Sequence, residues 1–185
     1  MVVIPLKNGG LKCQVSDFAV LVDPSSSARG DIVLRTFSPL PLLAGTDELI
    51  NTAGEYEING VRVRGIQING ESSEEKMRVV YAVELDEIRL CFLGGVSSPL
   101  SSEELDKLGE ADILFLSSGK FGLDEKSAAS LIKEIEPKAV IFAAYENLKA
   151  LSAALGQNPE EVDKFTVKRK DLTEDSRKIM VFKTE

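Results

Sequence analysis

Side chains that could carry chemistry follow the predicted β-strands in the second half of the chain. Ser117, Ser118 and Lys120 follow one apolar strand, and Tyr145 follows the next. A serine beside a lysine can act as nucleophile and base, because a desolvated lysine can lose its proton. No Gly-x-Ser-x-Gly turn surrounds these residues, so we interpret them as polar loop residues. Hydrolysis by serine and lysine is kept as an alternative.

Two aspartates near predicted strand ends are the candidates for a carboxylate-held metal. Asp23 and Asp112 could meet in one cleft. A calcium or magnesium site needs several oxygen ligands, and the sequence has no acidic spacing motif that would supply them. We therefore expect these aspartates to cap turns, with metal binding as the alternative.

Alternating apolar residues and turn signals predict short strands through the first half of the chain. The most distinct hairpin joins 55–58 to 61–68 through Asn59-Gly60, since this pair accepts the positive φ angles of a tight hairpin turn. The apolar alternation changes phase at Gly65, which predicts a β-bulge there. The other expected strands are 2–6, 11–15, 18–22, 32–36, 79–85 and 88–93.

The second half alternates helices with strands. A capping box at 101–104 begins a helix that Gly109 ends, and Asp124 caps a helix that Pro137 ends. A third helix is expected over 146–155, and the strands are 113–116, 139–143, 165–169 and 179–182. A strand, helix, strand succession indicates a partly parallel sheet. We predict a mixed α/β (α+β) protein with two face-to-face sheets and helices outside.

Composition limits the classes of function. The 185 residues predict a single domain, 1–185, and a net charge of −8 argues against nucleic-acid binding. No apolar stretch is long enough to span a membrane, and no export signal is visible. Cys13 and Cys91 are expected to be reduced core thiols, which favours a cytoplasmic location.

Six segments, taken in this order, carry a resemblance to a known family: 18–24, 30–34, 52–57, 93–95, 111–114 and 135–141. They resemble the metallo-β-lactamase-fold hydrolases, specifically their small lactonase-like branch. The resemblance implies a two-sheet αβ/βα sandwich, with helices on both outer faces and a metal cleft at the strand ends. It extends over most of the chain.

The family's metal motif, Thr-His-x-His-x-Asp-His, corresponds here to 36–42. Phe37, Pro39 and Leu42 stand at the histidine positions and Pro41 at the aspartate, and none offers a lone pair to a cation. Later ligand positions correspond to Gly95, Ser98 and Ala144. Because the chain contains no histidine, no shift of the alignment restores the motif. We expect no catalytic metal and no cofactor.

The segment from Phe37 to Leu43 is apolar where an active site would be wet. We expect it to fill the former cleft as a buried plug, with an exposed patch for a partner as the alternative. The predicted function is a binding or scaffolding role, with an unidentified protein partner or a homo-oligomer. The alternatives are a hydrolase with residual or altered activity and a non-catalytic subunit of a complex with an active homologue.

Overall fold

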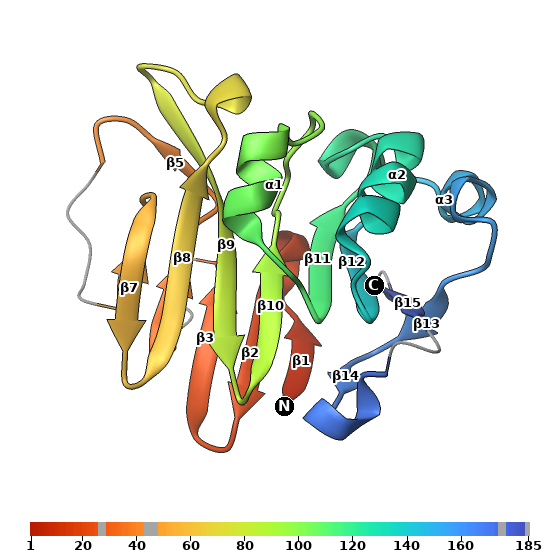
Figure 1. Cartoon of the computed structure of the whole chain (residues 1–185), viewed down its shortest axis with the longest axis horizontal. Helices are drawn as coiled ribbons and strands as arrows, with labels where there is room; N and C mark the ends of the chain where they lie inside the picture. The colour runs from red at the N-terminus through yellow and green to blue at the C-terminus, as the bar shows by residue number, and fades with distance from the viewer. Residues whose placement is uncertain (26–28, 43–47, 174–176, 184–185) are drawn as a thin grey trace.

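Two β-sheets pack face to face in the computed structural model, which describes residues 1–25, 29–42, 48–173 and 177–183 (Figure 1). The smaller sheet has the order β14-β1-β2-β3-β4-β6. Its strands are β1 (Val2–Pro5), β2 (Leu11–Val15), β3 (Phe18–Val22), β4 (Ile32–Leu34), β6 (Leu49–Ile50) and β14 (Phe165–Thr166). Strands β1 to β3 are antiparallel, whereas β3, β4 and β6 run parallel.

The larger sheet has the order β13-β15-β12-β11-β10-β9-β8-β7, and β5 pairs with β9. Its strands are β5 (Phe37–Pro39), β7 (Gly54–Ile58), β8 (Val61–Gln67), β9 (Lys76–Leu85), β10 (Ile88–Phe92), β11 (Ile113–Ser117), β12 (Ala139–Ala144), β13 (Glu160–Val162) and β15 (Lys178–Phe182). Pairing is parallel from β10 through β13, as the strand, helix, strand pattern predicted. The predicted fold class is confirmed.

Three α-helices of the described residues pack on the outer face of the larger sheet (Figure 1). They are α1 (Ser102–Leu108), α2 (Glu125–Ile135) and α3 (Leu148–Leu155). Their predicted caps are confirmed. Ser101 forms a capping box with Glu104, and the Asp124 side chain accepts hydrogen bonds from the backbone N–H groups of Lys126 and Ser127. The helices therefore cover one outer face of the described sandwich, whereas the resemblance implied helices on both.

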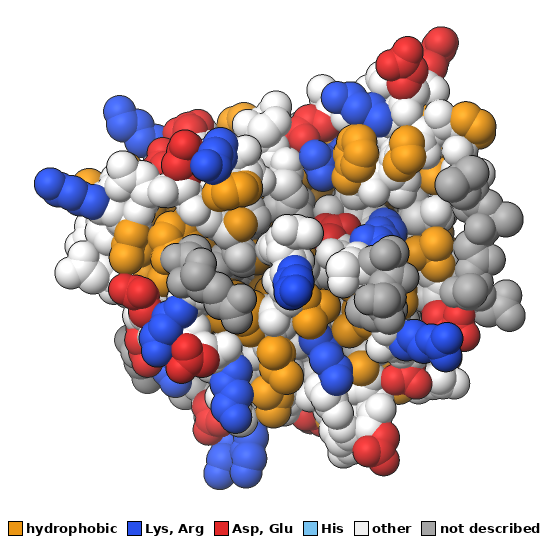
Figure 2. Space-filling model, turned by 180° about the vertical axis from the view of Figure 1, so that it is seen from behind, with side chains coloured by type: hydrophobic (Ala, Val, Ile, Leu, Met, Phe, Trp, Pro, Cys, Tyr) orange, Lys and Arg blue, Asp and Glu red, His pale blue; other side chains and the backbone are white. Residues whose placement is uncertain are grey.

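On the outer face of the smaller sheet, the loop that contains Gly30 lies against β3. Leu21 points to this side and is only 2% exposed. A Cβ added to Gly30 would lie 2.8 Å from Leu21 Cγ, so the adjoining loop lies close against the strand. Figure 2 shows this side of the molecule, on which acidic and basic side chains are interspersed with hydrophobic ones.

Two apolar cores follow from the two faces of the larger sheet. Val61 and Val63 of β8 point into the core between the sheets, whereas Ile66 points into the core beneath the helices. This change of face explains the phase change in the sequence, since both faces of β8 are buried near its end. The predicted bulge at Gly65 is wrong, because β8 pairs with β7 and β9 in continuous register.

Gly65 is required for another reason. A Cβ at this position would lie 2.7 Å from the backbone oxygen of Thr52 and 3.0 Å from Tyr81 Cε1. The segment before β7 therefore packs against bare backbone here. By contrast, the Asn59-Gly60 turn is confirmed, with positive φ angles of 51° and 80°.

Three differences from the predicted boundaries have local causes. Strand 165–169 ends at Thr166, because Arg169–Asp171 forms a short 3₁₀ helix, η4. Strand 32–36 ends at Leu34, and helix 146–155 begins at Leu148 with Asn147 as its N-cap.

Two further expectations concern the cysteines and membrane spans. Cys13 and Cys91 are buried free thiols, as predicted. Within the described ranges, no helix combines the length and apolarity that crossing a membrane would require.

Candidate functional site

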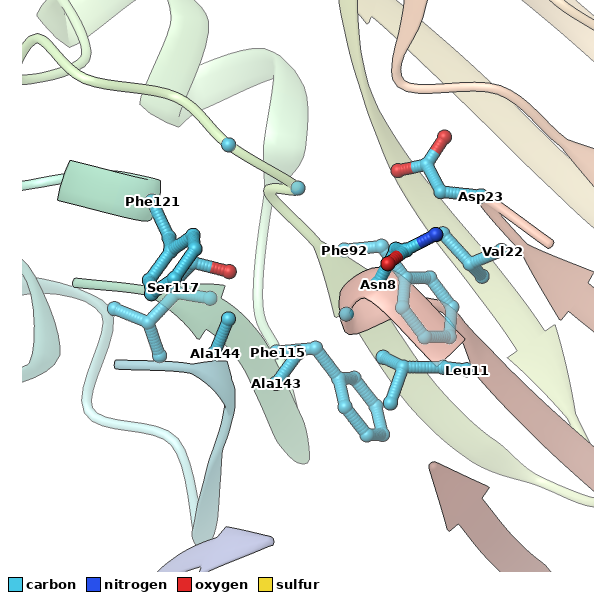
Figure 3. Close-up of a pocket in the computed structure, with 14 residues that line it drawn as sticks. Asn8, Leu11, Val22, Asp23, Phe92, Phe115, Ser117, Phe121, Ala143 and Ala144 are labelled. Atoms are coloured by element: carbon cyan, nitrogen blue, oxygen red, sulfur yellow. The ribbon is translucent and has the colours of Figure 1, made fainter. Parts of the chain in front are cut away.

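A cleft of about 150 Å³ opens where strands of both sheets end (Figure 3). Its walls come from Asp23 after β3, Gly95 after β10, Ser117 at the end of β11 and Ala144 at the end of β12. Parallel strands bring such residues together, because their carboxyl ends share one edge of the sheet. Asn8, from the 3₁₀ helix η1 (Lys7–Gly9), completes the rim.

The floor of the cleft is apolar. The rings of Phe92 and Phe115 stack with their centroids 4.6 Å apart and their planes 16° from parallel. Leu11 and Val22 approach these rings from the smaller sheet (Figure 3). A ligand in this cleft would therefore meet aromatic and aliphatic carbon at its base.

Asp23 is fixed at the rim by Thr36. Its two carboxylate oxygens accept hydrogen bonds from the Thr36 backbone N–H at 2.9 Å and the Thr36 hydroxyl at 2.5 Å. Burial raises the pKa of Asp23, and these hydrogen bonds only partly offset that increase. A Cβ on Gly94 would lie 2.2 Å from Thr36 Oγ1, so three chain segments meet here at close contact. This geometry supports a turn-fixing role for Asp23.

Asp112 does not lie beside Asp23, which argues against the alternative in which the two aspartates meet in one cleft. Asp112 precedes β11 and lies at its other end, whereas Asp23 follows β3 at the cleft. The Asp112 carboxylate contacts Lys138 Nζ at 3.0 Å and Arg169 Nη1 at 2.6 Å. Burial would raise the pKa of Asp112, but hydrogen bonds from Arg169, the Arg89 backbone and Lys138 outweigh it and lower the pKa to about 2.

The positions that correspond to lost ligands divide into two groups. Gly95 and Ala144 line the cleft, whereas Ser98 is exposed beside it. Phe37 and Pro39 belong to β5, and both are exposed.

The predicted plug is wrong for the described part of the segment. Phe37 is 46% exposed, Pro41 is exposed and Leu42 is half-buried, while Leu43 lies outside the described residues. The physical reason is strand pairing: β5 pairs with the start of β9, and this alternation buries Ser38 in place of Phe37.

The other residual cleft residues lie apart. Ser117 lines the cleft, but Ser118 is buried behind it and Tyr145 packs against the helix-side core. Ser117 and Lys120 stand at Ser-x-x-Lys spacing in the sequence, the spacing of one class of serine hydrolases. Among the described contacts, Ser117 Oγ and Lys120 Nζ form no hydrogen bond with each other, and Lys120 Nζ lies over the Phe121 ring at 5.1 Å. This arrangement does not provide a nucleophile with its base.

Arg78 lies beside the cleft-lining Gly95 and pairs with Glu71, and neither residue was expected from sequence. Glu71 lies in the 3₁₀ helix η2 (Asn69–Glu71). Its carboxylate accepts hydrogen bonds from the backbone N–H groups of Ser97 at 2.6 Å and Ser98 at 2.7 Å. Its second carboxylate oxygen lies 3.4 Å from Arg78 Nε, and the Arg78 guanidinium lies 5.1 Å from the Phe37 ring centroid. Only the pairing of β5 with β9 places Phe37 beside Arg78, and no local pattern signals it.

The donor atoms of the cleft do not fit a zinc-type ion. Asn8, Asp23 and Ser117 are the described lining residues with polar side chains, and both Asp23 oxygens already accept hydrogen bonds. Within the described ranges, no group of three or more His, Cys, Asp or Glu residues could hold a metal ion. Zinc sites need three or four nitrogen, sulfur or oxygen ligands.

A two-sheet sandwich with a cleft at the strand ends defines the class of the metallo-β-lactamase-like folds. Residues 11–143 match the beta-lactamase superfamily domain, so the chain belongs to this superfamily. The comparison with curated proteins gives no significant match.

Solved structures agree on the fold. A metallo-β-lactamase superfamily protein from Thermotoga maritima is 18% identical with a TM-score of 0.78, over 98% of this chain and 97% of that chain. The metallo-β-lactamase fold protein YhfI from Bacillus subtilis is 11% identical with a TM-score of 0.58, over 84% and 90%. An isothiocyanate hydrolase from Delia radicum gut bacteria is 12% identical with a TM-score of 0.62, over 91% and 100%.

Proposed function

We propose that this metallo-β-lactamase-fold protein has no catalytic metal and that its cleft binds a small organic ligand. One observation carries the proposal: Gly95 and Ala144 line the cleft at positions that the resemblance assigns to metal ligands, yet their side chains offer no donor atom. Small residues at these positions leave the cleft open. The protein keeps the superfamily's cleft and uses it for binding.

The size and lining of the cleft suit a compact apolar group with a polar edge. Its volume of about 150 Å³ is comparable to that of an engineered apolar cavity that binds benzene. The Asn8 amide and the Ser117 hydroxyl point toward the opening from opposite sides (Figure 3). They can hydrogen-bond a polar substituent while the stacked Phe92 and Phe115 rings contact the ligand body.

Metal analysis tests the first half of the proposal. Protein purified without chelator is measured by inductively coupled plasma mass spectrometry, before and after incubation with zinc, manganese and iron salts. We expect metal far below one ion per chain after desalting. Stoichiometric metal would overturn the metal-free proposal and favour a hydrolase with a carboxylate-held ion.

A binding experiment tests the second half. Benzyl alcohol is titrated into ¹⁵N-labelled protein, and we expect amide shift changes at Gly9, Gly95 and Ala144, which line the cleft. Ala144→Leu fills the opening and should weaken binding by at least about tenfold. Ala153→Leu, at an exposed position of α3, is the matched control. Absence of binding to the wild-type protein would refute a ligand-binding cleft of this kind.

A scaffolding role is the second candidate, supported by the exposed apolar segment at β5. Phe37, Pro39 and Pro41 are exposed there, and this surface could contact a protein partner or a second copy of the chain. Phe37→Asp combined with Leu42→Asp should leave the protein folded but reduce its oligomeric mass, measured by light scattering, if copies associate here. An unchanged mass would count against self-association at this surface.

A cytoplasmic location completes the proposal and is supported by the two buried free thiols. Cell fractionation tests it, and recovery of the protein in the extracellular fraction would contradict it.

A further inference from the structure

We infer that the cleft ligand carries an anionic group, a carboxylate or phosphate monoester, held at the cleft mouth by Arg78 and Lys120. The cleft mouth is the surface formed by Gly95, Phe121, Phe37 and these two cations. This inference rests on the proposed ligand-binding function and adds the chemical class of the ligand.

Arg78 lies next to Gly95, a residue that lines the cleft. Glu71 holds its Nε side at 3.4 Å, and the Phe37 ring lies beneath the guanidinium at 5.1 Å. Its Nη1 and Nη2 atoms lie 3.8 and 3.9 Å from the place where a Cβ on Gly95 would stand, and Gly95 lines the cleft. Neither Nη atom donates a hydrogen bond to another of the described residues. Two parallel N–H donors in this geometry match a carboxylate or a phosphate.

Lys120 provides the second cation, beside the cleft-lining Phe121. Its Nζ lies 5.1 Å from the ring of Phe121, which lines the cleft. A Cβ on Gly95 would lie 3.0 Å from the Phe121 backbone oxygen, so the 3₁₀ helix η3 (Gly119–Phe121) approaches closely here. The segment is anchored because the Lys120 backbone N–H donates to Glu146 Oε2 at 3.0 Å.

Exposed aromatic rings mark the same place. Phe37 and Phe121 are the large hydrophobic residues exposed in the described part of the chain, each at 46%. Each ring has a cation over its face. Such contacts hold a cation in place while its N–H groups remain available to a ligand.

Three carboxylates near the cleft mouth accept hydrogen bonds from the protein itself. Glu71 accepts hydrogen bonds from the backbone N–H groups of Ser97 and Ser98, and Glu146 accepts one from the backbone N–H of Lys120. Asp23 accepts two hydrogen bonds from Thr36. Arg78 and Lys120 therefore supply the charged N–H donors at the cleft mouth.

The test compares benzoate and phenyl phosphate with benzamide, the neutral isostere of benzoate, by ¹⁵N chemical-shift titration at low and high salt. We expect an anion to bind about tenfold more tightly than benzamide, with the advantage reduced by salt. The anion that binds more tightly, benzoate or phenyl phosphate, shows whether the ligand carries a carboxylate or a phosphate ester. Equal affinity for benzamide and both anions would overturn the inference.

Variants locate the preference. Arg78→Gln and Lys120→Gln should reduce the anion advantage while benzamide still binds, which shows that the cleft is folded; Arg78→Lys should keep part of the advantage. Arg62→Gln, on an exposed strand face, is the control. An anion preference unaffected by both Arg78→Gln and Lys120→Gln would refute the assigned residues. If no probe binds the wild-type protein, the proposed function fails as well, whereas benzamide binding without anion preference defeats this inference alone.

Discussion

The carboxylate of Asp112 makes a sharp prediction about acid stability. It is 1% exposed and contacts Lys138 at 3.0 Å, Arg169 at 2.6 Å and the Arg89 backbone N–H at 2.9 Å. Asp112→Asn keeps the shape of the side chain but removes its charge. Three nearby cations then lose their shared counter-charge at the amino end of β11.

The magnitude follows from the pKa. The ordinary pKa of 3.8 falls to about 2 in the folded protein. Since a tenfold change in proton affinity corresponds to about 1.4 kcal/mol, the full effect is roughly 2 kcal/mol. Arg169 and Arg89 are partly exposed, so solvent screening reduces the expected contribution to roughly 1–2 kcal/mol. This stability is present above about pH 4 and is lost as the pH falls to about 2, because the unfolded state binds the proton first.

Urea unfolding between pH 2 and pH 7 measures this effect. Asp112→Asn should be less stable than wild type at pH 7 by roughly 1–2 kcal/mol, and the difference should shrink toward pH 2. Asp106→Asn, at an exposed position of α1, is the matched control and should follow the wild-type curve. A constant difference between Asp112→Asn and wild type across this range would refute the reasoning.

Three further predictions concern packing, the cleft rim and the thiols. Gly65→Ala should destabilise the protein by about 1–3 kcal/mol in urea unfolding, because its Cβ would lie 2.7 Å from a backbone oxygen; Gly70→Ala, with nothing within 4 Å, is the control, and equal effects would contradict the packing argument. Thr36→Val removes the hydroxyl donor to the rim carboxylate and should lower stability by about 1–2 kcal/mol; an unchanged melting temperature would show that this bond contributes little. Burial raises the pKa of Cys13 and Cys91 to about 12, so Ellman's reagent at pH 8 should label neither thiol in native protein and both after unfolding; rapid native labelling would contradict their burial.

Local sequence patterns determined most of the secondary structure and the absence of histidine chemistry. The Asn59-Gly60 turn and the Ser101 capping box depend on backbone preferences of a few adjacent residues, which sequence alone expresses. The replaced metal motif could also be recognised, because Phe37, Pro39 and Leu42 cannot act as ligands wherever they lie.

Only the tertiary structure decided which residues meet. Asp23 and Asp112 both stand near strand ends, but one follows its strand and the other precedes it, so they lie at different places in the sandwich. The pairing of β5 with β9 exposes Phe37 and sets Arg78 over its ring. Such contacts join segments far apart in sequence and depend on strand order and sheet packing, which a local pattern does not specify.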